Sequence, residues 1–141
     1  MTVKQYLNQI RMLDVKINHR IKQAEEIRKK AFMLSGIDTE KDRVQTSHTG
    51  NTSLFFIDKY VDMMLKVDAM IDQYVDLKNT IITQIDSLED ERYCEILYYR
   101  YVDGMLFSQI ADKMGYTVDH VWRLHRYALK EFEKNVPVNV D

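Results

Sequence analysis

The sequence predicts an all-α protein, for three reasons. Only four glycines and one proline occur in 141 residues, and so few helix breakers favour long helices. Two long stretches repeat apolar residues at alternating steps of three and four, which is the spacing of coiled-coil helices. Residues 107–126 then show the spacing of two short helices joined by a tight turn. We therefore expect an antiparallel helical hairpin over residues 1–86, a three-helix domain over 87–135 and a C-terminal tail over 136–141.

The first long helix is expected at the N-terminus. Its apolar residues fit one heptad seam, which only Arg20 interrupts, and Ile21 beside it can compensate. The seam consists of Val3, Tyr6, Ile10, Leu13, Ile17, Ala24, Ile27, Ala31 and Leu34. Residues 35–51 are polar and contain Gly36 and Gly50, so we expect a loop there.

A second long helix is expected after this loop, with Thr52 or Ser53 as its N-cap. Its predicted seam is weaker, because Asp68 and Lys78 fall on seam positions. The apolar members of that seam are Leu54, Ile57, Val61, Met64, Ile71, Val75, Ile82 and Ile85.

The two long helices carry opposite charge. Residues 1–34 hold eight Lys/Arg and three Asp/Glu, whereas residues 52–90 hold three Lys/Arg and eight Asp/Glu. Attraction along their flanks therefore favours antiparallel pairing within the chain. A DNA or membrane patch is the alternative explanation of the basic helix. The same apolar seams also allow a homodimer through the hairpin.

The bulk composition excludes some classes of protein. The net charge of −2 gives no overall attraction toward nucleic acid. No stretch approaches the ~20 apolar residues that cross a bilayer, and the N-terminus lacks the apolar core and cleavage site of a signal peptide. We expect a cytoplasmic protein without membrane contact. Cys94, the single cysteine, lies in the apolar segment YCEILYY and is expected to be a buried structural thiol.

The stretch FSQIADKMGYTVDHVWRLHR, residues 107–126, has the spacing of a helix-turn-helix. Gly115 can supply a left-handed turn, and Thr117 can cap the second helix. Asp119 lies in the first turn of that helix, where the helix dipole favours a carboxylate. A preceding helix can start at Ser87 or Asp90 and end near Gly104. The residues expected in the core are Ile110, Ala111, Met114, Val121, Leu124, Ala128, Leu129 and Phe132.

Residues 88–132 resemble region 4 of sigma-70 factors, most clearly in YYRYVDGMLFSQIADKMGYT and RYALKEF. The whole chain, with YLNQIRMLDVKINHRI, a DRVQTS segment, an acidic helix and the sigma-like part, is similar to a family of small phage and prophage proteins. These are related to late-transcription regulators of the ArpU and RinA kind. The resemblance implies a DNA-binding transcription regulator of the bacterial host cell, which binds double-stranded DNA and acts with host RNA polymerase.

The resemblance also implies which side chains would enter the major groove. They are Val118, Asp119, His120, Trp122, Arg123, Arg126 and Lys130. Asp119 can accept a hydrogen bond from cytosine, Arg123 can contact a guanine edge or a phosphate, and Arg126 suits a phosphate. Sigma factors tend to have arginine where this chain has Val118 and Trp122, so the usual promoter preference is not carried over. Trp122 can contact DNA, contact protein, or pack within the fold.

No motif for catalysis is present in the sequence. Gly-rich phosphate loops and Ser/His/Asp sets are absent, and His120 and His125 lie too far apart around a helix to share a metal ion. We therefore expect no enzymatic activity, no cofactor and no metal. Two rival functions stay open. One is a protein-interaction or assembly module in which the helix-turn-helix is only packing, and the other is a recognition subunit for packaging phage DNA.

Overall fold

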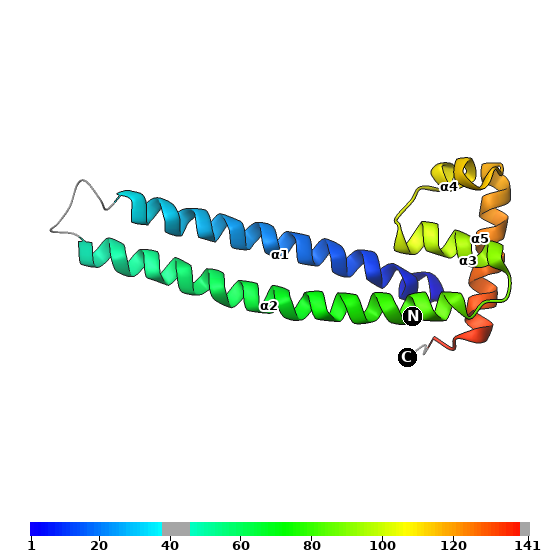
Figure 1. The fold of residues 1–141 in the computed structure, drawn as a ribbon, viewed down its shortest axis with the longest axis horizontal. Helices are drawn as coiled ribbons and strands as arrows, with labels where there is room; N and C mark the ends of the chain where they lie inside the picture. Colours follow the sequence, from blue (N-terminus) through cyan, green and yellow to red (C-terminus); the bar gives the residue numbers. More distant parts are fainter. Residues whose placement is uncertain (38–45, 139–141) are drawn as a thin grey trace. The chain divides into compact units, whose positions relative to one another are not determined.

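The computed structural model describes residues 1–37 and 46–138, with side chains for 1–34 and 52–138. Figure 1 shows its helices in chain order. They are α1 (Val3–Ile37), α2 (Thr46–Asp86), α3 (Glu91–Leu97), the π-helix η1 (Tyr98–Val102), α4 (Phe107–Met114) and α5 (Val118–Asn135). The described residues contain no strand, so the predicted all-α class is confirmed.

The contacts divide the chain into two compact units. Unit 1 joins Met1–Asp14 to Tyr74–Asp141, and unit 2 is Val15–Gln73. These units divide the chain at different residues from the expected domains, because the first turns of α1 and the last turns of α2 belong with the C-terminal helices.

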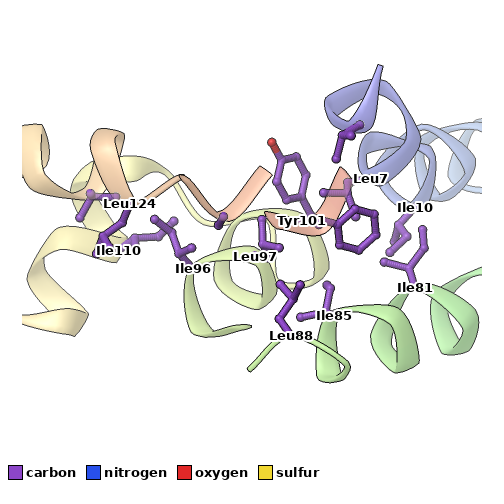
Figure 2. Close-up of a cluster of buried hydrophobic side chains, with 14 of the residues drawn as sticks. Leu7, Ile10, Ile81, Ile85, Leu88, Ile96, Leu97, Tyr101, Ile110 and Leu124 are labelled. Carbon is purple, nitrogen blue, oxygen red and sulfur yellow. The ribbon is translucent and has the colours of Figure 1, made fainter. Parts of the chain in front are cut away.

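The core of unit 1 explains this grouping (Figure 2). Leu7 of α1 and Ile81 and Ile85 of α2 are fully buried in the same cluster as Ile96, Leu97 and Ile110. Tyr6 on α1 also donates a hydrogen bond of 2.6 Å to Gln84 Oε1 on α2. The other fully or nearly fully buried members are Val3, Ile10, Leu88, Tyr101, Ala111, Val121, Leu124, Ala128 and Phe132.

Unit 2 contains the end of α1 and the first part of α2, which lie side by side (Figure 1). Ser53 on α2 is buried, and its hydroxyl donates to the backbone carbonyl of Ala31 on α1 at 3.1 Å. Among the described side chains of this unit, Ile17, Ala24 and Ala31 of α1 are buried, as is Val67 of α2. The predicted seam of α1 holds over its whole length, since none of its members is exposed.

The predicted seam of α2 is wrong by one residue over most of its length, whereas its last member, Ile85, is buried and Met64 and Ile82 are half-buried. Leu54, Ile57, Val61, Ile71 and Val75 are exposed by 38–58%. The buried and half-buried positions instead follow the heptad Ser53, Phe56, Tyr60, Met63, Val67, Met70, Tyr74, Leu77 and Ile81. Both registers of α2 hold many apolar residues, so apolar spacing alone did not distinguish them. The tyrosines and the serine of the true seam made it look less apolar than the predicted one.

The expected loop over 35–51 also needs correction. Residues 35–37 continue α1 and residues 46–51 already belong to α2, while 38–45 lie outside the described residues. Thr52 and Ser53 therefore lie inside α2 and do not cap it. A glycine inside a helix costs only about 1 kcal/mol, so the glycines that suggested the loop do not end the helices.

The predicted caps of the shorter helices are present, but the helix expected to end near Gly104 is an α-helix only to Leu97 and continues as a π-helix to Val102. Asp90 caps α3 by accepting a hydrogen bond from the Arg92 amide, and Thr117 caps α5 by accepting from the His120 amide. Gly104 and Gly115 adopt left-handed backbone with φ of 69° and 73°. Such φ values strain any residue with a Cβ atom.

Candidate nucleic-acid interface

The helix α5 has one buried face and one exposed face. Its buried side chains lie at steps of three and four and pack into the core of unit 1, where Phe132 and Val121 are fully covered. The opposite face carries Asp119, Arg123 and Arg126, which are exposed. Helices that enter a DNA groove have this arrangement, which they share with amphipathic surface helices in general.

A tight turn fixes how α5 follows α4. Gly115 ends α4 in left-handed backbone, and the Tyr116 amide donates to the Ala111 carbonyl at 2.9 Å. Thr117 then starts α5. Ile110 and Ala111 on α4 are buried in the same cluster as Val121 and Leu124 on α5. The two helices are therefore held by both a short turn and a shared core.

The structure places all seven residues of the expected site on α5, but in different surroundings. Five of them are exposed, with little involvement in packing: Val118, Asp119, Arg123, Arg126 and Lys130. Arg123, Arg126 and Lys130 make no ion pair with another described side chain, so their charges face solvent. His120 is half-buried, and its ring meets the ring of Tyr116 edge-on at 4.5 Å between centroids.

Trp122 packs within the fold and is also exposed. Its ring stacks on Phe107 of α4 at 4.2 Å between centroids, while 45% of the residue stays accessible. Leu106 and Val118 are also exposed apolar residues of this region, by 60% and 42%. One face of the indole is therefore used for packing, and the accessible remainder is open to a partner.

Arg100 is half-buried and its guanidinium packs against the fold with its charge intact. Its guanidinium lies 4.3 Å from the centre of the Phe107 ring, and its Nη1 donates to the Met105 carbonyl at 2.9 Å. Lys113 similarly lies over the ring of Tyr99 at 5.0 Å. On α5 itself the exposed basic residues are Arg123, Arg126, Lys130 and Lys134, next to the acidic Asp119, Glu131 and Glu133. The local charge is only weakly positive.

A buried histidine supports α5 from behind, and sequence reasoning did not single it out. His125 is 2% exposed, and its Nε2 lies 2.7 Å from the hydroxyl of Tyr101 on η1. Burial lowers the pKa of His125 to about 4, with the positive charges of Lys4 and Arg100 adding to the effect. Burial also raises the pKa of Tyr101 to about 12. At neutral pH the imidazole is therefore neutral, and it shares a hydrogen bond with the tyrosine hydroxyl whose donor depends on the imidazole tautomer. His125 lies four residues after Val121 and three before Ala128, and this spacing is the sequence signal that could have predicted its burial.

Cys94 has the surroundings of a structural thiol. It is half-buried, and its thiol donates to the Ile85 carbonyl at 3.2 Å. Burial, followed by the nearby charge of Asp86, raises its pKa. A raised pKa lowers the thiolate fraction and hence the reactivity of a cysteine.

No group of three or more His, Cys, Asp or Glu side chains is placed to hold a metal ion within the described part of the chain. No helix in that part is long and apolar enough to cross a membrane.

Comparison with known proteins found no match: no protein-family model, no curated protein and no solved structure is significantly similar to this chain.

Proposed function

We propose that this protein is a phage or prophage transcription regulator that binds double-stranded DNA through the exposed face of α5 and acts with host RNA polymerase. The observation that carries the proposal is the form of α5. Its core face is fixed by Val121, Leu124 and Phe132, while Arg123 and Arg126 face solvent without an ion-pair partner among the described residues. Unpaired arginines on a firmly held helix suit phosphate and base contacts. The resemblance of residues 88–132 to sigma region 4 supports the same function.

The weak local charge limits how such a protein works. Affinity for DNA comes mainly from neutralised phosphates, and each contact adds to the salt dependence. Three basic residues on the outer face of α5 give a small electrostatic contribution. One copy alone is therefore expected to bind weakly, and a second DNA-bound component, such as RNA polymerase or another copy, supplies the remaining affinity.

The test is selection of bound duplexes from a random pool at low salt, followed by salt titration of the selected sequence. Arg123→Ala/Arg126→Ala should weaken specific binding by roughly tenfold or more, since a base-edge arginine contributes about 1–3 kcal/mol. Lys59→Ala/Lys66→Ala is the matched control, because it removes the same charge from the exposed side of α2. Equal losses of DNA affinity in the two variants would show that the effect depends only on the net charge of the protein and not on the position of the arginines. No enrichment with or without RNA polymerase would refute the proposal.

A second candidate function is favoured by the exposed apolar residues beside α5. Leu106, Val118 and Trp122 together suit contact with a protein, as in an assembly module or a recognition subunit that delivers phage DNA to a packaging enzyme. A pure assembly module predicts no DNA affinity at low salt, and Trp122→Ala would then weaken binding to the protein partner while Arg123→Ala/Arg126→Ala would not.

A further inference from the structure

The helix α2 carries two heptad registers, and unit 2 uses only one of them. The inner register, with Ser53, Tyr60 and Val67, faces α1. The outer register follows it one residue later and consists of Leu54, Ile57, Val61, Met64 and Ile71, with Asp68 interrupting it. One residue corresponds to a rotation of 100° around a helix. The outer register is therefore a separate apolar stripe beside the seam, and Leu54, Ile57 and Val61 are exposed by 58%, 44% and 48%.

The apolar stripe continues onto α1 within unit 2. Phe32 of α1 is 79% exposed, and it lines a shallow groove together with Arg28, Ala31, Ile57 and Tyr60. Phe32 and the outer register of α2 thus lie on the same face of the helix pair. We call this face, made of Phe32 and the outer register, the outer face. A two-helix coiled coil needs one seam per helix, whereas a helix with two adjacent seams suits a bundle of more helices.

In the described parts of unit 2, positive charge gathers on α1 and negative charge on α2, and no ion pair joins the two helices. Residues 15–34 hold six Lys/Arg and two Asp/Glu, so they carry +4, and residues 52–73 hold two Lys/Arg and four Asp/Glu, so they carry −2. Within these two described ranges the only ion pair joins Arg28 to Glu25, both on α1. The expected neutralisation of α1 by α2 therefore does not occur through ion pairs inside this part of the chain.

We propose that the outer face is the interface between two copies of this chain, which form a four-helix bundle with α1 of each copy against α2 of the other. Charge selects this arrangement. Placing α1 on α1 would bring two segments of +4 together, whereas α1 on α2 brings +4 onto −2. The same arrangement covers Phe32 with the apolar outer register of the other copy. Because it is isologous, each copy contributes both halves of the contact, and the assembly closes at two.

This proposal goes beyond the proposed function and stands on unit 2 alone. A dimer would carry two copies of α5, which suits a reader whose single copy has little positive charge. The test is nevertheless made without DNA, so that failure of dimerisation and failure of DNA binding are separate results.

The first experiment is sedimentation equilibrium of the full chain at micromolar concentrations. The wild type is expected to have the mass of a dimer. Ile57→Glu/Val61→Glu places two carboxylates in the outer face and should weaken association by about tenfold or more, which corresponds to 1.4 kcal/mol. Ala69→Glu/Gln73→Glu adds the same charge at exposed positions of α2 outside the stripe and should remain a dimer. All four positions are exposed, so far-UV circular dichroism should show unchanged helix content.

A second experiment tests the wild-type chain and its helix arrangement. Equal amounts of ¹⁴N- and ¹⁵N-labelled protein are mixed and cross-linked with a carbodiimide, so that isotope-mixed peptides report contacts between copies. Mixed cross-links are expected between lysines of α1, such as Lys29, and aspartates of α2, such as Asp58. A monomeric wild type, a mass above that of a dimer, an Ile57→Glu/Val61→Glu variant of unchanged mass, or mixed cross-links that avoid α1–α2 pairs would each overturn the proposal.

Discussion

His125 shows at the scale of a single residue how the fold of unit 1 constrains the chemistry of α5. The side chain lies behind the exposed face, bonded to Tyr101 and in contact with the rings of Phe107 and Trp122. Proton uptake would place a positive charge on a side chain that is 2% exposed and packed against aromatic rings, which is unfavourable. The fold therefore keeps this histidine neutral.

This environment predicts that stability depends on pH. The pKa of His125 falls from an ordinary value of 6.5 to about 4 in the folded chain. Between these values the unfolded chain binds a proton that the folded chain does not, so the free energy of unfolding decreases as pH falls from 6.5 toward 4. The loss amounts to at most roughly 3 kcal/mol. Urea unfolding across this pH range measures it.

His125→Gln should flatten the pH dependence, because glutamine does not titrate. His19→Gln, at an exposed position of α1, is the control and should leave the slope as in the wild type. A His125→Gln variant whose free energy of unfolding changes with pH as steeply as that of the wild type would show that other groups cause the effect.

At the scale of the helix, α2 provides a direct comparison between its two registers. Val67 is 1% exposed and Val61 is 48% exposed, although both are valines in the same helix. Val67→Ala should lower the free energy of unfolding by roughly 1–2 kcal/mol, since two buried methyl groups are lost and a cavity forms. Val61→Ala should change it by less than about 0.5 kcal/mol in the monomer. Chemical denaturation at low protein concentration measures both free-energy changes. A larger loss for Val61→Ala than for Val67→Ala would show that the register expected from the sequence is the buried one.

The same helix shows why part of the fold could be predicted from the sequence and part could not. Caps and turns are local, so Asp90, Gly104, Gly115 and Thr117 could be located from their own chemistry. The choice between two apolar registers on α2 depends on what α1 presents to it, which is information that a single helix does not contain. The inner register also includes Ser53, whose hydroxyl is satisfied by a carbonyl of another helix.

The candidate site shows the same division. The exposed and buried faces of α5 follow from its 3.6-residue period, and Arg123 and Arg126 lie on its exposed face as expected from the sequence. The partners of Arg100 and Trp122 depend on how α4 packs against α5 and η1, so neither the Arg100–Phe107 contact nor the Trp122–Phe107 stack could be read from spacing.

At the scale of the whole molecule, the core of unit 1 links the chain's N-terminus to its C-terminal helices. Four residues of the long helices are at most 3% exposed and lie in the same core cluster as residues of α3, α4 and α5. They are Leu7 and Ile10 of α1 and Ile81 and Ile85 of α2. A fragment of residues 87–141 would expose the side chains that these four cover. We expect this fragment to lack a cooperative unfolding transition, unlike the full chain.

Thermal unfolding followed by circular dichroism tests this expectation. Adding a peptide of residues 74–86 and a peptide of residues 1–14 should restore helicity in part, because both supply core residues of unit 1. A sharp transition in the isolated fragment, with the midpoint of the full chain, would show that the C-terminal helices are stable without the long ones.

The central claim is that the exposed face of α5 binds DNA, and amide-resolved NMR during titration with a random-sequence duplex at low salt tests it most directly. Phosphate contacts form on any sequence, so specificity is not required for a signal. Amide shifts are expected to concentrate in residues 118–130 and to disappear at high salt. Shifts that avoid α5, or no shifts anywhere at low salt, would contradict the claim and favour the assembly module.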